Sequence, residues 1–158
     1  MSETALDPHV ERLLSGFNDH DVDRYMRQYA DGATFRDPFV GEITKPELRD
    51  YVRESYGAFP DFRIELDRVL SARDPTALEI TFVGTHEGPF YGIPPTGERG
   101  ELPAVVVMDV AEDGITVRRD YWDRRGFREE LGLTFPAVLG RLPSVAWRAL
   151  RDRLGRTP

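Results

Sequence analysis

The spacing of the apolar residues changes near residue 60, and this change limits the folds open to the chain. Over residues 8–59 apolar residues recur every three or four positions, as on one face of a helix. From residue 62 they alternate with polar residues, as in strands with one buried face. Helices first and consecutive strands afterwards predict an α+β fold with a mostly antiparallel sheet, and not an alternating α/β fold.

Three helices are predicted in the first part of the chain, each from a start signal followed by an apolar stripe. The side chains that can cap them are Asp7, Asp21 and Thr44. The stripes run over residues 10–17, 22–29 and 48–59. Pro8 at the first helical position supports the first helix, and Glu47 completes a capping box with Thr44 for the third.

The remaining elements are strands and short helices. Strands are predicted at residues 33–39, 62–66, 78–82, 102–110 and 115–122, with a hairpin turn at residues 112–114. A short helix is predicted from Asp123 to Leu131, and another from Pro143 or Ser144. We expect a single domain over residues 1–158, in which a curved sheet wraps around a helix and leaves a pocket between them.

The residue types exclude several kinds of site. The chain has no cysteine, which excludes disulfides, thiolate nucleophiles and cysteine-ligated metals. Its histidines, at positions 9, 20 and 86, lack the spacing of metal ligands on one helix. There is no glycine-rich phosphate loop and no nucleophile elbow. We therefore expect chemistry by side-chain acids and bases, without a metal or a bound cofactor.

Charge and hydropathy also indicate where the protein works. The formal net charge is −7, although the chain carries ten arginines against five acidic residues from residue 118 onward. A nucleic-acid-binding domain usually carries a basic stripe on a basic domain, so nucleic acid is not an expected partner. The N-terminus lacks the features of a signal peptide, and no stretch approaches the roughly 20 apolar residues of a membrane span. We expect a cytoplasmic protein without a membrane partner.

Ionisable residues gather in two motifs separated by one apolar strand, HEGPFYGIPPTG at residues 86–97 and RRDYWD at residues 118–123. Asp120 lies between apolar and aromatic neighbours, so it is either the partner of an arginine such as Arg118 or Arg119, or a general base whose pKa burial has raised. Asp123 points to the other side of the extended strand, and it either caps the next helix or contacts a ligand.

Two further polar residues are candidates for the pocket. His86 shares the face of the apolar residues on the preceding strand, either as a core-edge histidine or as a group that orients a substrate oxygen. Asp37 either ends its strand at a turn or faces the pocket. Aromatic residues that could form its walls and bind a flat polycyclic ligand are Phe35, Phe39, Phe59, Phe62, Phe82, Phe90, Tyr91 and Trp122.

These motifs, with the EDG turn and the closing FREELGL, resemble the SnoaL-like polyketide cyclase family of the NTF2-like superfamily over residues 8–133. Residues 134–158 fall outside the resemblance, as an extension that we expect to be helical. The resemblance implies a cone-shaped α+β barrel with an internal apolar cavity, assembled as a homodimer or a higher homo-oligomer. It also implies that Asp120 is the acid/base residue, and that His86 and Asp37 position the substrate.

The family closes the last ring of anthracycline precursors by an aldol condensation, and it also contains members regarded as hydroxylases. The cyclases carry a second histidine where this chain has Val106, a residue that cannot relay a proton. The resemblance therefore favours a hydroxylase of aromatic polyketides, in which the substrate anion reacts with oxygen and a separate reductase supplies electrons. The alternatives are a cyclase, a ketosteroid-isomerase-like proton shuttle, and a non-catalytic module that binds a flat hydrophobic ligand.

Overall fold

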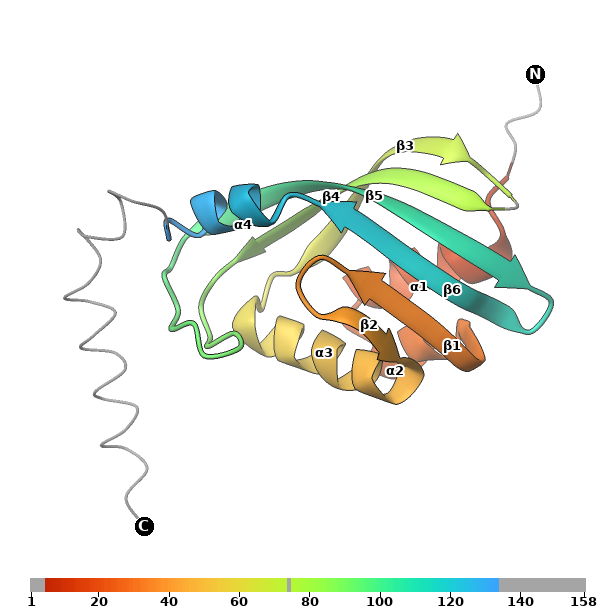
Figure 1. Ribbon diagram of the computed structural model, residues 1–158, viewed down its shortest axis with the longest axis horizontal. Coiled ribbons are helices and arrows are strands. Elements are labelled where there is room, and N and C mark those ends of the chain that lie inside the picture. The colour runs from red at the N-terminus through yellow and green to blue at the C-terminus, as the bar shows by residue number, and fades with distance from the viewer. Residues whose placement is uncertain (1–4, 74, 134–158) are drawn as a thin grey trace, which may run out of the picture.

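One six-stranded sheet and four helices make up the described part of the chain, residues 5–73 and 75–133 of the computed structural model (Figure 1). In chain order the elements are α1 (Pro8–Asn18), α2 (Val22–Met26), β1 (Tyr29–Asp37), β2 (Gly41–Thr44), α3 (Lys45–Ala58), β3 (Arg63–Ser71), β4 (Thr76–Thr85), β5 (Arg99–Ala111), β6 (Gly114–Trp122) and α4 (Arg124–Glu130). This arrangement confirms the α+β prediction. The extension at residues 134–158, with its predicted helix, lies outside the described residues.

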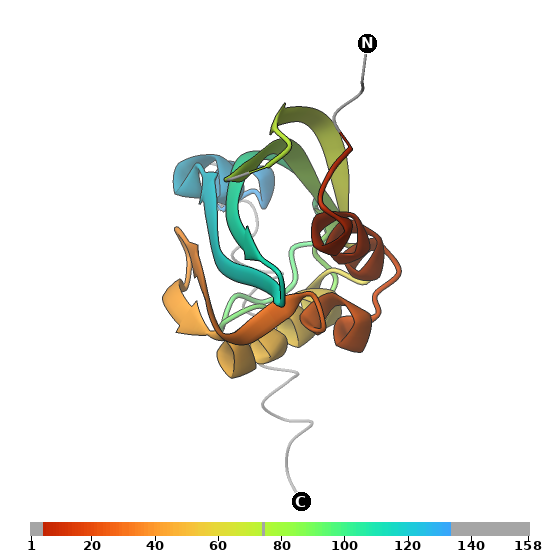
Figure 2. The same ribbon diagram turned by 90° about the vertical axis from the view of Figure 1, so that its right-hand side faces the viewer.

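The strand order is β2-β1-β6-β5-β4-β3. Strands β3 to β6 form an antiparallel meander, and β1 joins it by pairing in parallel with β6. The sheet curves strongly, and α1, α2 and α3 lie across the side that it leaves open (Figure 2). The inner face of the sheet and the helices therefore share one core.

The predicted helix starts are confirmed by their capping hydrogen bonds. The Asp7 carboxylate accepts from the backbone N–H of His9 at 2.8 Å, and the Asp21 carboxylate accepts from that of Arg24 at 2.9 Å. At the third helix the backbone N–H of Thr44 donates to the Glu47 carboxylate at 2.7 Å. Each bond satisfies a backbone or capping group that the first helical turn leaves without an intrahelical partner.

The predicted second helix is too long. It ends at Met26, and Tyr29 begins β1 instead of completing the helical stripe. The helix ends early because of a tertiary contact. The backbone N–H of Ile115 on β6 donates to the carbonyl of Gln28 at 2.8 Å, so the chain at this point pairs with the sheet. Strand β2 was not predicted, since its four residues are mostly exposed and show no alternation.

Alternation along β6 sorts its side chains between the inside and the outside of the barrel. Asp120 is 5% exposed, whereas its neighbour Tyr121 is 56% exposed. Strand pairing sets Leu78, Val106 and Asp120 beside one another on the inner face. The predicted separation of the two carboxylates of this motif is confirmed, since Asp120 is buried and Asp123 is exposed. No helix in the described ranges is long and apolar enough to cross a membrane.

Candidate active site

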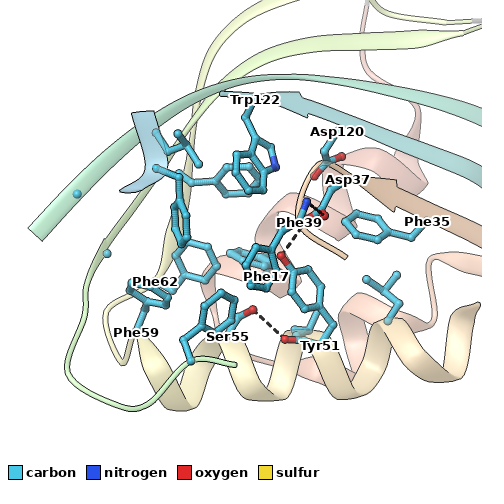
Figure 3. Close-up of a pocket in the computed structure, with 18 of the residues that line it drawn as sticks. Phe17, Phe35, Asp37, Phe39, Tyr51, Ser55, Phe59, Phe62, Asp120 and Trp122 are labelled. Carbon is cyan, nitrogen blue, oxygen red and sulfur yellow. Dashed lines mark hydrogen bonds between the residues drawn. The ribbon is translucent and has the colours of Figure 1, made fainter. Parts of the chain in front are cut away.

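A cavity with mainly aromatic walls lies between the inner face of the sheet, α3 and α4 (Figure 3). Half of the lining residues are aromatic: Phe17, Tyr25, Phe35, Phe39, Tyr51, Phe59, Phe62, Phe82, Phe90, Trp122 and Phe127. The cavity has a volume of about 90 Å³, whereas a single buried water needs roughly 10–15 Å³ on the same measure. It therefore has room for more than isolated waters.

Three acidic residues line this cavity, Asp37, Asp120 and Glu130, and Figure 3 shows the carboxylates of Asp37 and Asp120 close together in it. The parallel pairing of β1 with β6 explains why they meet. Phe35 pairs with Arg118 and Arg36 pairs with Arg119, so the residues that follow in each strand continue side by side on the inner face. Both carboxylates are nearly buried, at 6% and 5% exposure. The fold thus places two acids together in an apolar environment.

Asp120 forms a buried ion pair with Arg118, two residues earlier on the same strand. The guanidinium binds both carboxylate oxygens, with Nε to Oδ1 and Nη2 to Oδ2 each at 2.7 Å. Both side chains are 3% exposed. Arg118 Nη1 also donates to the hydroxyls of Tyr25 at 2.8 Å and Tyr29 at 3.3 Å. The arginine partner that the sequence left as an alternative is therefore present, inside the cavity.

The electrostatic environment of Asp120 suits a group that gains and loses a proton. Burial raises the pKa of the Asp120 carboxyl, the Arg118 guanidinium opposes this shift, and the negative charge of Asp37 adds to it. The net direction is upward, since removal from water disfavours the charged form. A carboxyl with a raised pKa is a stronger base than an ordinary aspartate once it is ionised.

Asp37 is held in place by three hydrogen bonds. Its Oδ1 accepts from the backbone N–H groups of Phe39 and Val40, each at 2.8 Å. Its Oδ2 accepts from the hydroxyl of Tyr51 on α3 at 2.9 Å. The turn at the end of β1 and a role in the cavity are thus compatible, because one carboxylate oxygen closes the turn while the other meets a cavity-lining tyrosine.

His86 is fully buried but is not among the residues that line the cavity. Its ring stacks on Phe59, a lining residue, with centroids 5.1 Å apart. Nδ1 lies 3.3 Å from both the backbone nitrogen and the hydroxyl of Thr96, and Nε2 has no hydrogen-bond partner among the described residues. The structure places His86 behind the aromatic wall, and its predicted role toward the substrate stays a prediction.

Burial also makes His86 a source of pH-dependent stability. It lowers the pKa of His86 from the ordinary 6.5, so below that pH the unfolded chain binds a proton that the folded chain resists. Stability should therefore be full above pH 6.5 and fall as the pH drops, by at most about 1.4 kcal/mol per pH unit. Denaturant unfolding at about pH 7.5 and about pH 5 measures this. His86→Gln should flatten the dependence and His9→Gln should not; an unchanged slope in His86→Gln would contradict the assignment.

The other predicted site residues divide between the cavity and its surroundings. Those that line it are Phe35, Phe39, Phe59, Phe62, Phe82, Phe90 and Trp122. Val106 is buried beside Asp120 in the strand pairing but is not a lining residue. Tyr91 is half exposed and packs against the lining residues Phe39 and Phe90. Asp123 caps α4, with its Oδ1 accepting from the backbone N–H of Arg125 at 2.9 Å.

Several lining residues were not selected from the sequence. Arg118 could have been, because it shares the strand face of Asp120 and Trp122. Tyr51 gave no such signal, since its contact with Asp37 depends on how α3 packs against β1. No group of three or more metal-ligating His, Asp or Glu side chains occurs within residues 5–73 and 75–133.

The chain resembles a known sequence family and several solved structures. The sequence model of the SnoaL-like domain family matches residues 10–119. No curated protein matches the chain significantly. Among solved structures, AclR of Streptomyces galilaeus, a candidate hydroxylase, superposes with a TM-score of 0.70 at 21% identity, over 80% of this chain and 94% of AclR.

Two further structures have the same fold. A candidate SnoaL-like polyketide cyclase from Jannaschia sp. CCS1 gives a TM-score of 0.69 at 19% identity, over 78% of this chain and 88% of its own. A Catenulispora acidiphila protein with a ketosteroid isomerase-like fold gives 0.70 at 15% identity, over 84% and 97%. These likenesses, with the curved sheet and its helices, confirm the predicted NTF2-like barrel.

Proposed function

Given that the chain belongs to the SnoaL-like domain family, we propose that it is an enzyme that modifies flat aromatic polyketides, with Asp120 as its general base. The observation that carries the proposal is a buried carboxylate in an aromatic cavity, with its pKa raised and a second carboxylate beside it. The aromatic walls suit the faces of a polycyclic substrate. The name of the Jannaschia structure, a candidate polyketide cyclase, agrees with a polyketide substrate.

The first chemical step is the removal of a proton from a carbon next to a carbonyl group. The C–H bond breaks, its electron pair spreads into the carbonyl and the ring system, and the proton is taken by an Asp120 oxygen. A positioned general base of this kind contributes a rate factor of roughly 10²–10⁴. The apolar walls keep water away from the resulting anion, which preserves its reactivity.

We propose that the anion then reacts with dioxygen, so that the product is hydroxylated. Oxygen adds to the carbanion with a proton to give a hydroperoxide, which two electrons and two protons reduce to the alcohol and water. A separate reductase supplies those electrons. The occupant of position 106 supports this route over ring closure, because an aldol condensation needs a group to protonate the acceptor carbonyl, and Val106, next to Asp120, has no proton to give.

The products of one incubation distinguish these reactions. The protein is mixed with a late anthracycline intermediate, with and without oxygen and a quinone reductase, and the products are analysed by mass spectrometry. Hydroxylation predicts the gain of one oxygen atom only when oxygen and reductase are both present. An isomeric ring-closed product without oxygen would instead establish a cyclase. An unchanged substrate in every arm would contradict both.

A second candidate is a ketosteroid-isomerase-like proton shuttle, and the adjacent carboxylates favour it. Asp37 and Asp120 lie at one side of the cavity, so a proton taken from one carbon of a bound ring could be returned to another (Figure 3). Such an enzyme would convert a β,γ-unsaturated ketone into its conjugated isomer without oxygen. The absorbance of the conjugated product under anaerobic conditions measures this activity.

A further inference from the structure

One N–H donor of the Arg118 guanidinium is not used in its hydrogen bonds to Asp120, Tyr25 and Tyr29. Arginine has five N–H groups; Nε and Nη2 each donate one hydrogen bond to Asp120, and Nη1 donates to the hydroxyls of Tyr25 and Tyr29. One Nη2–H is therefore left without a partner among the described residues. Arg118 lines the cavity, and among the described residues it is the only cationic side chain in that lining. A bound molecule with a suitably placed oxygen can accept this hydrogen bond.

The surroundings of Arg118 fix its position. The hydroxyls of Tyr25 and Tyr29 accept from Nη1 and lie 2.9 Å from each other. The ring of Phe35 lies against the guanidinium, with the central carbon 5.5 Å from the ring centroid, within the range of a cation–π contact. A guanidinium held from these sides is preorganised, and preorganised donors are the ones that stabilise charge developing in a transition state.

Charge has to move when Asp120 accepts a proton from a substrate carbon. The negative charge leaves the carboxylate and appears on the substrate's carbonyl oxygen, while the guanidinium stays positive. Without a cation beside that oxygen, the charge would be buried in an apolar cavity that also contains the Asp37 carboxylate. A guanidinium in contact with both sites keeps the charge paired before and after the transfer.

We therefore infer that Arg118 is itself a catalytic residue, whose free Nη2–H binds the substrate oxygen that becomes negative. This inference rests on the proton transfer proposed above. The C–H bond breaks, the Asp120 O–H bond forms, and the electron pair rests on the oxygen beside Arg118. The substrate class narrows accordingly to an enolisable ketone whose carbonyl carbon is bonded to the acidic carbon. Tyr25 and Tyr29 are then positioning residues that act through Arg118.

Binding of alizarin tests this inference without turnover. Alizarin is a flat dihydroxyanthraquinone whose phenol changes colour on ionisation, so a spectral titration of the complex reports whether the bound oxygen is neutral or negative. In Asp120→Asn the guanidinium is no longer neutralised by a carboxylate. We expect the bound phenol to ionise at lower pH than in the wild type, which corresponds to anion binding tighter by on the order of tenfold.

Two double variants identify the residue responsible. Adding Arg118→Met to Asp120→Asn should abolish the gain, and this double variant should fold because neither member of the ion pair is left buried without the other. Adding Arg119→Met is the matched control, because Arg119 pairs with Asp109 on the same strand outside the cavity lining, and it should keep the gain. Equal ionisation in the two double variants, or no alizarin binding by Asp120→Asn, would overturn the inference.

The same data separate this inference from the proposed function. A colour shift that depends on Arg118 together with no turnover of any polyketide would leave Arg118 as an anion-binding group and reject the enzyme. Turnover that depends on Asp120 with no Arg118-dependent shift would reject the inference and keep the enzyme.

Discussion

Asp120→Asn is expected to lower turnover by on the order of a hundredfold or more while a flat aromatic ligand still binds. Asparagine fills the space of the carboxylate but cannot take a proton from a carbon acid at neutral pH. The aromatic walls that hold the ligand are unchanged by the substitution. Product formation by mass spectrometry and ligand binding by fluorescence quenching measure the two effects separately.

Asp123→Asn is the matched control, because asparagine caps a helix about as well as aspartate. Asp123 belongs to the same motif as Asp120 but caps α4 and does not line the cavity. Its variant should turn over substrate at close to the wild-type rate. Unaltered turnover in Asp120→Asn would show that Asp120 is not the base. A wild-type protein that binds the ligand but shows no turnover would favour the binding-module alternative.

Arg118→Met is expected to destabilise the fold by about 3–5 kcal/mol, since it leaves the Asp120 carboxylate buried without its partner. Methionine has a similar length but no donor for either carboxylate oxygen. The hydroxyls of Tyr25 and Tyr29 also lose the Nη1 donor. Denaturant-induced unfolding, followed by circular dichroism, measures the loss.

Removing the acid as well should restore most of that stability. In Arg118→Met/Asp120→Leu an apolar pair replaces the buried ions, and such replacements are often neutral or stabilising. The cycle of the two single variants and the double variant gives the coupling between the side chains. A double variant that is less stable than both single variants would show that the ion pair is not the main contribution of these residues. Neither Arg118→Met nor Arg118→Met/Asp120→Leu is expected to turn over substrate.

The sequence predicts the elements of this fold better than it predicts their contacts. Helix caps are local, so Asp7, Asp21 and Thr44 could be identified from their neighbours. Strand alternation is local too, and it separated Asp120 from Asp123. The end of α2 was misplaced because β6 draws Tyr29 into the sheet, and no pattern near Tyr29 reports a strand that distant in the sequence.

The site residues, too, divide into those with a local sequence signal and those that depend on tertiary packing. Asp120 stands out because an acid is disfavoured among apolar strand residues, and the residue pattern of β6 also places Arg118 on its face. The meeting of Asp37 with Tyr51 depends on α3 packing against β1, and a sequence alone does not specify that contact. Strand parity predicts that His86 shares the apolar face of the preceding strand, but β4 ends one residue before His86, so parity no longer fixes its direction.

The parallel pairing of β1 with β6 has a consequence for how the protein folds. The hairpins among β3, β4, β5 and β6 join neighbours in the chain, whereas β1 and β6 are separated by most of the described sequence. Closing so long a loop costs more conformational entropy than closing a hairpin. The two carboxylates thus meet only through the least local pairing in the sheet. A chain that has completed its meander but not this pairing has most of its strands in place and no acid pair.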